Sequence, residues 1–78
     1  MSDDIIPDAA TALKVGTAIL EARYGEELFR KGLPYKAVLY NGEWLVVADR
    51  PATGKGGGTP ELKLSMKDGR VTRISWSR

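Results

Sequence analysis

The stretch YKAVLYNGEWLVVA, residues 35–48, decides the fold of this chain. Two runs rich in branched and aromatic residues flank Asn41-Gly42, a pair that accepts the positive φ angles of a type I′ turn. A two-residue turn there pairs Tyr40 with Glu43 and Leu39 with Trp44, which predicts a β-hairpin. The apolar face of this hairpin carries Tyr35, Ala37, Leu39, Trp44, Val46 and Ala48.

A second hairpin is predicted after residues 49–59, a glycine-rich stretch that is expected to be a flexible loop. Residues 61–66 alternate between apolar and polar side chains, and Asp68-Gly69 marks the following turn. We favour a three-residue turn with a bulge at Gly69, because a slip of one residue would move every side chain to the opposite face. The pairs expected in this register are Leu62 with Ile74, Leu64 with Thr72 and Met66 with Arg70.

The spacing of apolar residues before Pro34 is helical. It predicts a helix over residues 8–24, with the Asp8 carboxylate capping its first turn, and a short helical turn from Glu26 to Lys31 that Gly32 ends. Gly16 lies in the middle of the apolar stripe, which indicates that another backbone packs closely there. The stripe consists of Ala9, Ala12, Leu13, Gly16, Ile19, Leu20 and Tyr24.

A helix with one apolar stripe and a sheet with one apolar face bury each other. The sequence therefore predicts an α+β fold in which the N-terminal helix and a short second helix pack on a curved four-stranded antiparallel sheet of two hairpins. Residues 8–78 are expected to form one small domain behind a flexible N-terminus of residues 1–7. The expected core is Leu13, Leu20, Leu39, Trp44, Val46, Leu62, Leu64 and Ile74.

The composition argues against an enzyme. The 78 residues include no cysteine and no histidine, which removes the commonest nucleophilic thiol, general base and zinc ligand. Adjacent Glu26 and Glu27 point about 100° apart on a helix and so do not converge as an acid pair. Residues 53–59 are rich in glycine around a lysine but lack the spacing and the strand-loop-helix context of a phosphate-binding loop. We expect no catalytic residue, no metal and no cofactor.

The formal net charge of +2 points to no particular class of partner. The last hairpin is basic, with Lys63, Arg70, Arg73 and Arg78, but aromatic residues do not interleave with these charges as they do in RNA-binding surfaces. The apolar runs are far shorter than the roughly 20 residues of a membrane helix. We expect neither a nucleic acid nor a membrane as partner. The acidic start, Met1 to Asp4, predicts a cytoplasmic protein, or a periplasmic one if a signal peptide has been removed.

Five short motifs, in this order and spacing, resemble the bacterial immunity proteins with a nuclear-transport-factor-2-like (cystatin-like) fold. They are Tyr24-Gly25-Glu26-Glu27, Pro34-Tyr35-Lys36-Ala37, Gly42-Glu43-Trp44-Leu45-Val46, Gly57-Gly58 and Lys67-Asp68-Gly69-Arg70-Val71. The resemblance covers roughly residues 8 to 76. It implies a protein without catalytic residues that binds and neutralises a cognate secreted toxin.

The sheet face turned away from the helix is unexpectedly apolar for a solvated surface. We expect it to contact the toxin, with positive charge added from the neighbouring loop; a homodimer stacked sheet to sheet is the other possibility. The candidate residues are Val38, Tyr40, Leu45 and Val47 on the face, and Arg50 and Lys55 on the loop. The alternatives are a small-molecule module, which needs a pocket of about 300 Å³ or more, and a nucleic-acid-binding domain that uses the basic hairpin.

Overall fold

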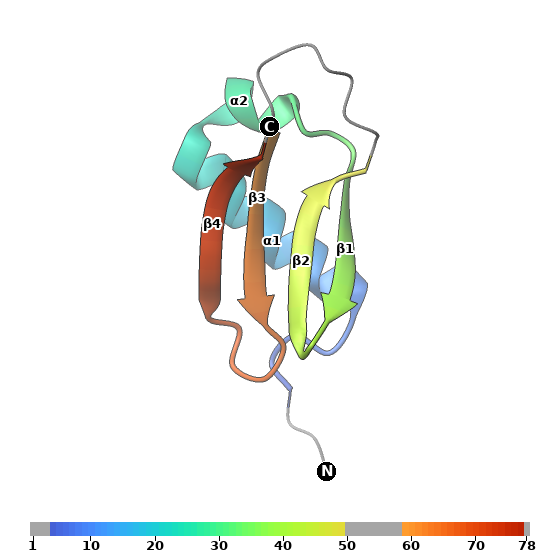
Figure 1. Cartoon of the computed structure of the whole chain (residues 1–78). Helices are drawn as coiled ribbons and strands as arrows, with labels where there is room; N and C mark the ends of the chain where they lie inside the picture. The colour runs from blue at the N-terminus through green and yellow to red at the C-terminus, as the bar shows by residue number, and fades with distance from the viewer. Residues whose placement is uncertain (1–3, 50–58, 78) are drawn as a thin grey trace.

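The computed structural model describes residues 4–49 and 59–77, without the side chain of residue 77. Two helices, α1 (Ala9–Tyr24) and α2 (Glu26–Arg30), precede four strands: β1 (Tyr35–Tyr40), β2 (Glu43–Ala48), β3 (Thr59–Ser65) and β4 (Val71–Ser77). The strands form one antiparallel sheet in the order β1-β2-β3-β4, and α1 crosses one face of it (Figure 1). The predicted α+β fold of one helical layer on a four-stranded sheet is confirmed.

Helix α1 begins and ends where the sequence predicts. The carboxylate of Asp8 accepts a hydrogen bond of 2.8 Å from the backbone N–H of Thr11, which satisfies one free donor of the first turn. Gly25 ends the helix with φ of 88°, and its N–H donates to the carbonyl of Glu21. This left-handed φ suits glycine, and it separates α1 from α2.

The first hairpin has the predicted register, with Tyr40 opposite Glu43 and Leu39 opposite Trp44. Asn41 has φ of 51° and Gly42 has φ of 75°, as a type I′ turn requires. Because side chains alternate along a strand, this register alone places Trp44 and Val46 toward α1 and Val38 and Leu45 on the opposite face.

The second hairpin differs from the prediction in its turn. The backbone N–H of Ser65, not that of Met66, donates a hydrogen bond to the carbonyl of Arg70. The N–H of Gly69 donates to the carbonyl of Ser65 and closes the turn. Leu62 faces Ile74 as expected, but the irregularity lies between Lys63 and Leu64, so Leu64 faces Val71. The bulge therefore leaves Thr72, not Gly69, as the extra residue. This displacement keeps apolar Val71 opposite buried Leu64.

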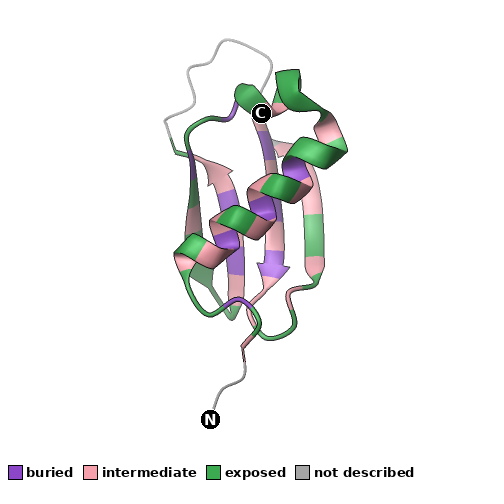
Figure 2. Cartoon of the chain, turned by 180° about the vertical axis from the view of Figure 1, so that it is seen from behind, coloured by how far each residue is buried: buried purple, intermediate pink, exposed green. Residues whose placement is uncertain are grey.

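The core lies between α1 and the sheet (Figure 2). Five of the eight expected core side chains are buried, and Leu13 and Ile74 are half-buried. The prediction that Leu39 belongs to the core is wrong. Its side chain is 47% exposed, because it lies near the end of an edge strand that has a neighbour on one side only. The buried hydrophobic residues are Ile6, Ala12, Leu20, Tyr35, Trp44, Val46, Leu62 and Leu64.

Two glycines make room for side chains rather than for backbone. A Cβ on Gly16 would stand 2.7 Å from Cγ2 of Val46, so α1 approaches a side chain of β2 and not its backbone. A Cβ on Gly32 would stand 2.3 Å from the hydroxyl oxygen of Tyr35. That hydroxyl donates to the carbonyl of Phe29, and the Phe29 and Tyr35 rings stack at 5.0 Å.

The packed structure begins before residue 8, where the sequence predicted a flexible N-terminus. The N–H groups of Ile5 and Ile6 donate to the carbonyls of Lys67 and Met66 at 3.0 Å. The indole N–H of Trp44 donates to the carbonyl of Ile6 at 2.7 Å, and the Ile6 side chain is buried. The segment is held because it covers the end of the core beside the β3–β4 turn. Of the predicted loop of residues 49–59, residues 50–58 lie outside the described chain, and Thr59 belongs to β3.

Candidate functional site

The candidate site is the outer face of the sheet, which neither helix covers (Figures 1 and 2). Four of the predicted site residues lie there together on β1 and β2. Val38 is directly opposite Leu45, Val47 is opposite Lys36, and Tyr40 is opposite Glu43. We call Val38, Tyr40, Leu45 and Val47 the outer patch.

Exposure varies within the outer patch. Tyr40 is 67% exposed and Val38 is 42% exposed, whereas Leu45 and Val47 are half-buried. The patch thus combines a highly exposed aromatic side chain with aliphatic side chains that are less exposed. This arrangement suits contact with an apolar partner surface, because an exposed aromatic ring can enter a pocket on the partner. Arg50 and Lys55, the predicted charged members of the site, lie outside the described residues.

Leu39 is a surface residue that the sequence reasoning assigned to the core. It lies between Val38 and Tyr40 on β1, so three consecutive apolar or aromatic side chains are exposed at the end of an edge strand. The pattern within the strand gives no signal for this exposure, because Leu39 continues the alternation of Tyr35 and Ala37. Leu39 adjoins the turn, whereas Tyr35 and Ala37 stand nearer the start of the strand.

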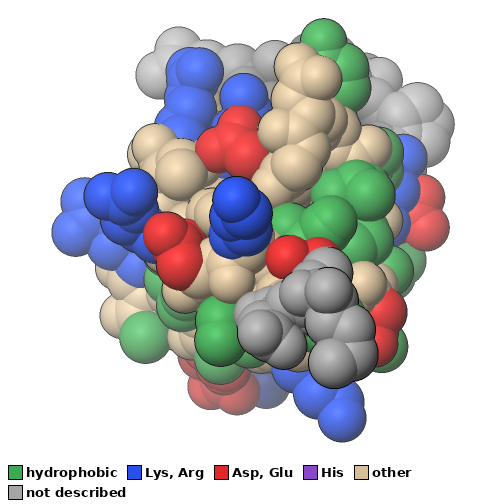
Figure 3. Space-filling view, turned by 90° about the horizontal axis from the view of Figure 1, so that it is seen from below, with side chains coloured by type: hydrophobic (Ala, Val, Ile, Leu, Met, Phe, Trp, Pro, Cys, Tyr) green, Lys and Arg blue, Asp and Glu red, His purple; other side chains and the backbone are tan. Residues whose placement is uncertain are grey.

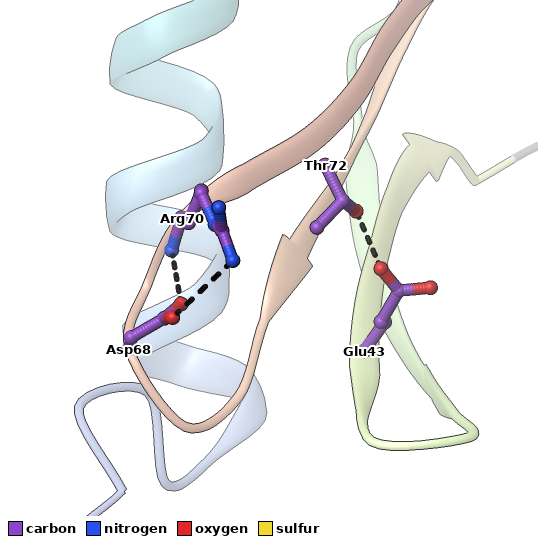
Figure 4. A network of polar contacts seen from close by, with 4 residues as sticks. All are labelled: Glu43, Asp68, Arg70 and Thr72. Carbon is purple, nitrogen blue, oxygen red and sulfur yellow. Dashed lines mark hydrogen bonds and ion pairs between the residues drawn. The ribbon is translucent and has the colours of Figure 1, made fainter.

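Polar side chains border the outer patch on the side of β3 and β4. The hydroxyl of Thr72 donates to the carboxylate of Glu43, which links β4 to β2 across β3 (Figure 4). Lys63 faces Arg73 across β3 and β4, and the hydroxyl of Ser75 donates to the carboxylate of Glu61. Acids are therefore interspersed with the bases of the last hairpin.

The turn between β3 and β4 fixes a further acid beside a base. The backbone N–H of Arg70 donates to the carboxylate of Asp68 at 2.9 Å, and its guanidinium lies 4.0 Å from the same group (Figure 4). This backbone hydrogen bond, more than any other contact, lowers the pKa of the Asp68 carboxyl below its usual value. The turn thus holds a negative charge within the basic hairpin, which weakens the case for a nucleic-acid surface.

A shallow hollow of about 120 Å³ lies on the outer face over β2, β3 and β4. It is lined by Leu45, Glu61, Leu62, Lys63, Arg73 and Ser75. Pockets that hold small molecules are larger, at about 300 Å³ or more. This hollow is too small for the small-molecule alternative.

Figure 3 views the end of the sheet that carries both hairpin turns. Hydrophobic side chains form a larger area toward β1 and β2, and Lys and Arg gather mainly on the side of β4 with Asp and Glu among them. Within residues 4–49 and 59–77, no three acidic side chains lie close enough to hold a metal ion. Neither helix in these residues has the length and apolar character needed to span a membrane.

Comparison with known proteins identifies a family. A family model described as NTF2 fold immunity protein matches residues 11–78, which is most of the chain. No curated protein matches the chain. No solved structure matches it either. The family match covers α1 apart from its first two residues, α2 and all four strands, and so includes the outer patch.

Proposed function

Because this chain belongs to the NTF2 fold immunity proteins, we propose that it binds a cognate bacterial protein toxin and neutralises it by direct contact, without catalysing a reaction. The family gives the general role of immunity. The outer patch is the surface that we assign to the toxin, with Arg50 and Lys55 adding charge from the adjoining segment. The protein acts in the compartment where it meets the toxin, which we propose is the cytoplasm.

The observation that carries this proposal is the composition of the uncovered sheet face. An antiparallel sheet with one solvated face normally alternates between apolar and polar side chains, with the polar ones outside. Here Val38, Leu45 and Val47 stand on the outside together with the exposed ring of Tyr40. An interface with an apolar centre and a polar rim has this composition, and Lys36, Glu43 and Lys63 are placed to form the rim.

The experiment uses the cognate toxin, sought first among the products of genes next to the one that encodes this chain, co-expressed with the chain and also purified for binding measurements. The double variant Tyr40→Ala, Leu45→Ser should keep the fold, since neither side chain faces α1. Loss of an aromatic anchor typically weakens an interface by about 2 kcal/mol or more, so the dissociation constant should rise about thirtyfold or more and protection should fall.

Leu28→Ser is the matched control. Leu28 is an exposed apolar side chain on α2, away from the outer face, so its loss should leave binding and protection unchanged. If the double variant folds, binds and protects as the original chain does, the outer patch is not the toxin site. If it becomes monomeric and still protects, the patch serves self-association instead, which light scattering would detect.

A further inference from the structure

The free edge of β1 is a second surface of this molecule that could bind another chain, in this case through its backbone. β1 is at the end of the sheet order, and no described segment of the chain pairs with its outer side. Exposed, flat and apolar edge strands are sites of strand pairing, and proteins usually guard them with charges or bulges. Each edge strand has a single charged residue, Lys36 on β1 and Arg73 on β4. The difference is the bulge: the pairing of β4 has one beside Leu64, whereas β1 pairs with β2 without any irregularity.

The register of the first hairpin fixes which backbone groups point to this edge. The carbonyl of Pro34 accepts from the N–H of Asp49, so the even-numbered residues of β1 form the hydrogen-bonded pairs with β2. The N–H and C=O groups of Ala37 and Leu39 therefore point away from the sheet. These four backbone groups can form hydrogen bonds with a further antiparallel strand.

We propose that the occupant of this edge is the β1 strand of a second copy of this chain, paired antiparallel about a two-fold axis at Val38. In that register Ala37 of each copy pairs with Leu39 of the other, and the four outward N–H groups find four carbonyl partners. A two-fold contact needs a patch that is complementary to itself. The side chains of β1 meet that condition on both faces of the sheet.

On the inner face, the small side chain of Ala37 lies opposite the exposed Leu39 of the other copy. On the outer face, Val38 meets Val38 on the axis, and Lys36 lies opposite the ring of Tyr40. A lysine ammonium over an aromatic ring is a favourable pair. Lys36 can reach it, because its present contact, with Asp49 at 3.8 Å, is an exposed and weak one.

The competing two-fold register, centred on Ala37, is less complementary. It places Lys36 beside Val38 and Tyr40 beside Pro34 of the other copy, which separates the cation from the ring. It also brings two small side chains, Ala37 and Ala37, together on the axis while Leu39 meets the buried ring of Tyr35. Of these two registers, the one centred on Val38 gives the exposed side chains the better-matched neighbours.

This dimer joins the two sheets into one of eight strands. The two-fold axis stands perpendicular to the sheet, so both outer patches lie on the same side and become neighbours across the axis. The dimer goes beyond the proposed function and does not depend on it, because its test measures mass and cross-linking without any toxin.

The first experiment measures mass by light scattering. The original chain should have twice its 8.5 kDa mass. Val38→Lys and Val38→Glu each place like charges opposite each other on the axis, which destabilises a strand pair, so each variant alone should be monomeric. An equimolar mixture of the two should again form dimers, because the opposite charges then face each other.

The second experiment uses the absence of cysteine from the chain. Val38→Cys should form a disulfide-linked dimer on mild oxidation, because Cα atoms of such a non-hydrogen-bonded pair lie about 4.5 Å apart, within disulfide range. Leu45→Cys is the matched control on the same face. Its two copies would be three strand spacings apart, about 14 Å, which is too far for a disulfide.

Three results would overturn the proposal. A monomeric original chain at hundreds of micromolar with no Val38→Cys cross-link would show that the edge has no affinity for itself. Cross-linking of Leu45→Cys without Val38→Cys would indicate sheets stacked face to face. A dimeric chain whose mass is unaffected by either charged variant, both folded by circular dichroism, would place the contact elsewhere. If the charged variants fail to fold, the cysteine pair decides alone.

Discussion

Gly16 lies where α1 crosses β2, and its missing side chain sets how closely the helix approaches the sheet. An added methyl group would stand 2.7 Å from Cγ2 of Val46, a branched and fully buried side chain that has little freedom to turn. Alanine would gain about 1 kcal/mol in helix propensity, and overpacking costs typically about 1–3 kcal/mol. Gly16→Ala should therefore lower the free energy of unfolding by up to about 2 kcal/mol, measured by urea titration.

The control for this prediction is the same substitution in a variant that lacks the Val46 methyl groups. In a Val46→Ala background, which is itself destabilised, Gly16→Ala should raise stability by about 1 kcal/mol, because only the helix propensity remains. An equal effect of Gly16→Ala in both backgrounds would mean that the contact with Val46 does not limit the approach of α1.

Asp8 makes the stability of α1 depend on pH. The hydrogen bond from the N–H of Thr11 is the largest of the contacts that lower the pKa of the Asp8 carboxyl. Because the folded pKa lies below the unfolded value of about 3.9, the cap contributes stability above that pH. The contribution is lost as the pH falls through the folded pKa.

Asp8→Asn keeps a capping oxygen but does not titrate. On acidification from pH 5 to pH 2, the melting temperature of the original chain should therefore fall further than that of Asp8→Asn. Asp68, whose pKa is also lowered, is present in both proteins, so its effect cancels in the comparison. Parallel melting curves over this range would contradict a stabilising role for the charge at the N-terminus of α1.

At the scale of elements, two strand leucines on the helix-facing side show how unevenly the sheet is covered. Leu64 is fully buried on central strand β3, whereas Leu39 is about half exposed at the end of β1. Leu64→Ala should cost about 2–5 kcal/mol, as buried leucines do. Leu39→Ala should cost the isolated domain less than about 1 kcal/mol, since it removes little buried surface.

Chemical denaturation at a concentration where the chain is monomeric would test this pair of leucines. A large cost at Leu39 under those conditions would mean that it packs against the core after all. If the cost at Leu39 appears only at high protein concentration, the residue contributes through self-association.

The first hairpin was predictable because Asn41-Gly42 leaves one choice of turn, and that choice fixes every pair along β1 and β2. The second hairpin was predictable only in part. Asp68-Gly69 marks a turn but allows more than one length, and the bulge at Thr72 depends on keeping Val71 opposite Leu64. No local sequence pattern shows which turn length also keeps the apolar side chains of both strands on the same face.

The candidate site, too, could be predicted from the sequence only in part. The outer patch could be predicted because alternation along the strands determines the face of each side chain once the turn is known. The exposure of Leu39 could not be predicted in this way, because it depends on where α1 crosses the sheet and not on the pattern within β1. Residues 5 and 6 were missed because an apolar pair before a helix cap gives no periodicity, although two adjacent isoleucines are an unusual choice for a solvated end.

At the scale of the whole molecule, 78 residues form a thin core, and each element that closes it matters. The N-terminal segment closes the end beside the β3–β4 turn, where Ile6 is buried and its carbonyl receives the indole N–H of Trp44. Ile6→Ala should therefore lower the free energy of unfolding by about 2–5 kcal/mol, a large share of the stability of a domain this small.

The neighbouring Ile5 provides the matched control, because it makes the same type of backbone hydrogen bond but is 61% exposed. Ile5→Ala should change the free energy of unfolding by less than about 1 kcal/mol. In a Trp76→Phe background, Trp44 alone reports by fluorescence, and Ile6→Ala should shift its emission toward the red as water reaches the ring. Equal effects of the two substitutions would mean that the segment is held by its backbone alone. An unshifted spectrum with full stability would mean that it does not close the core.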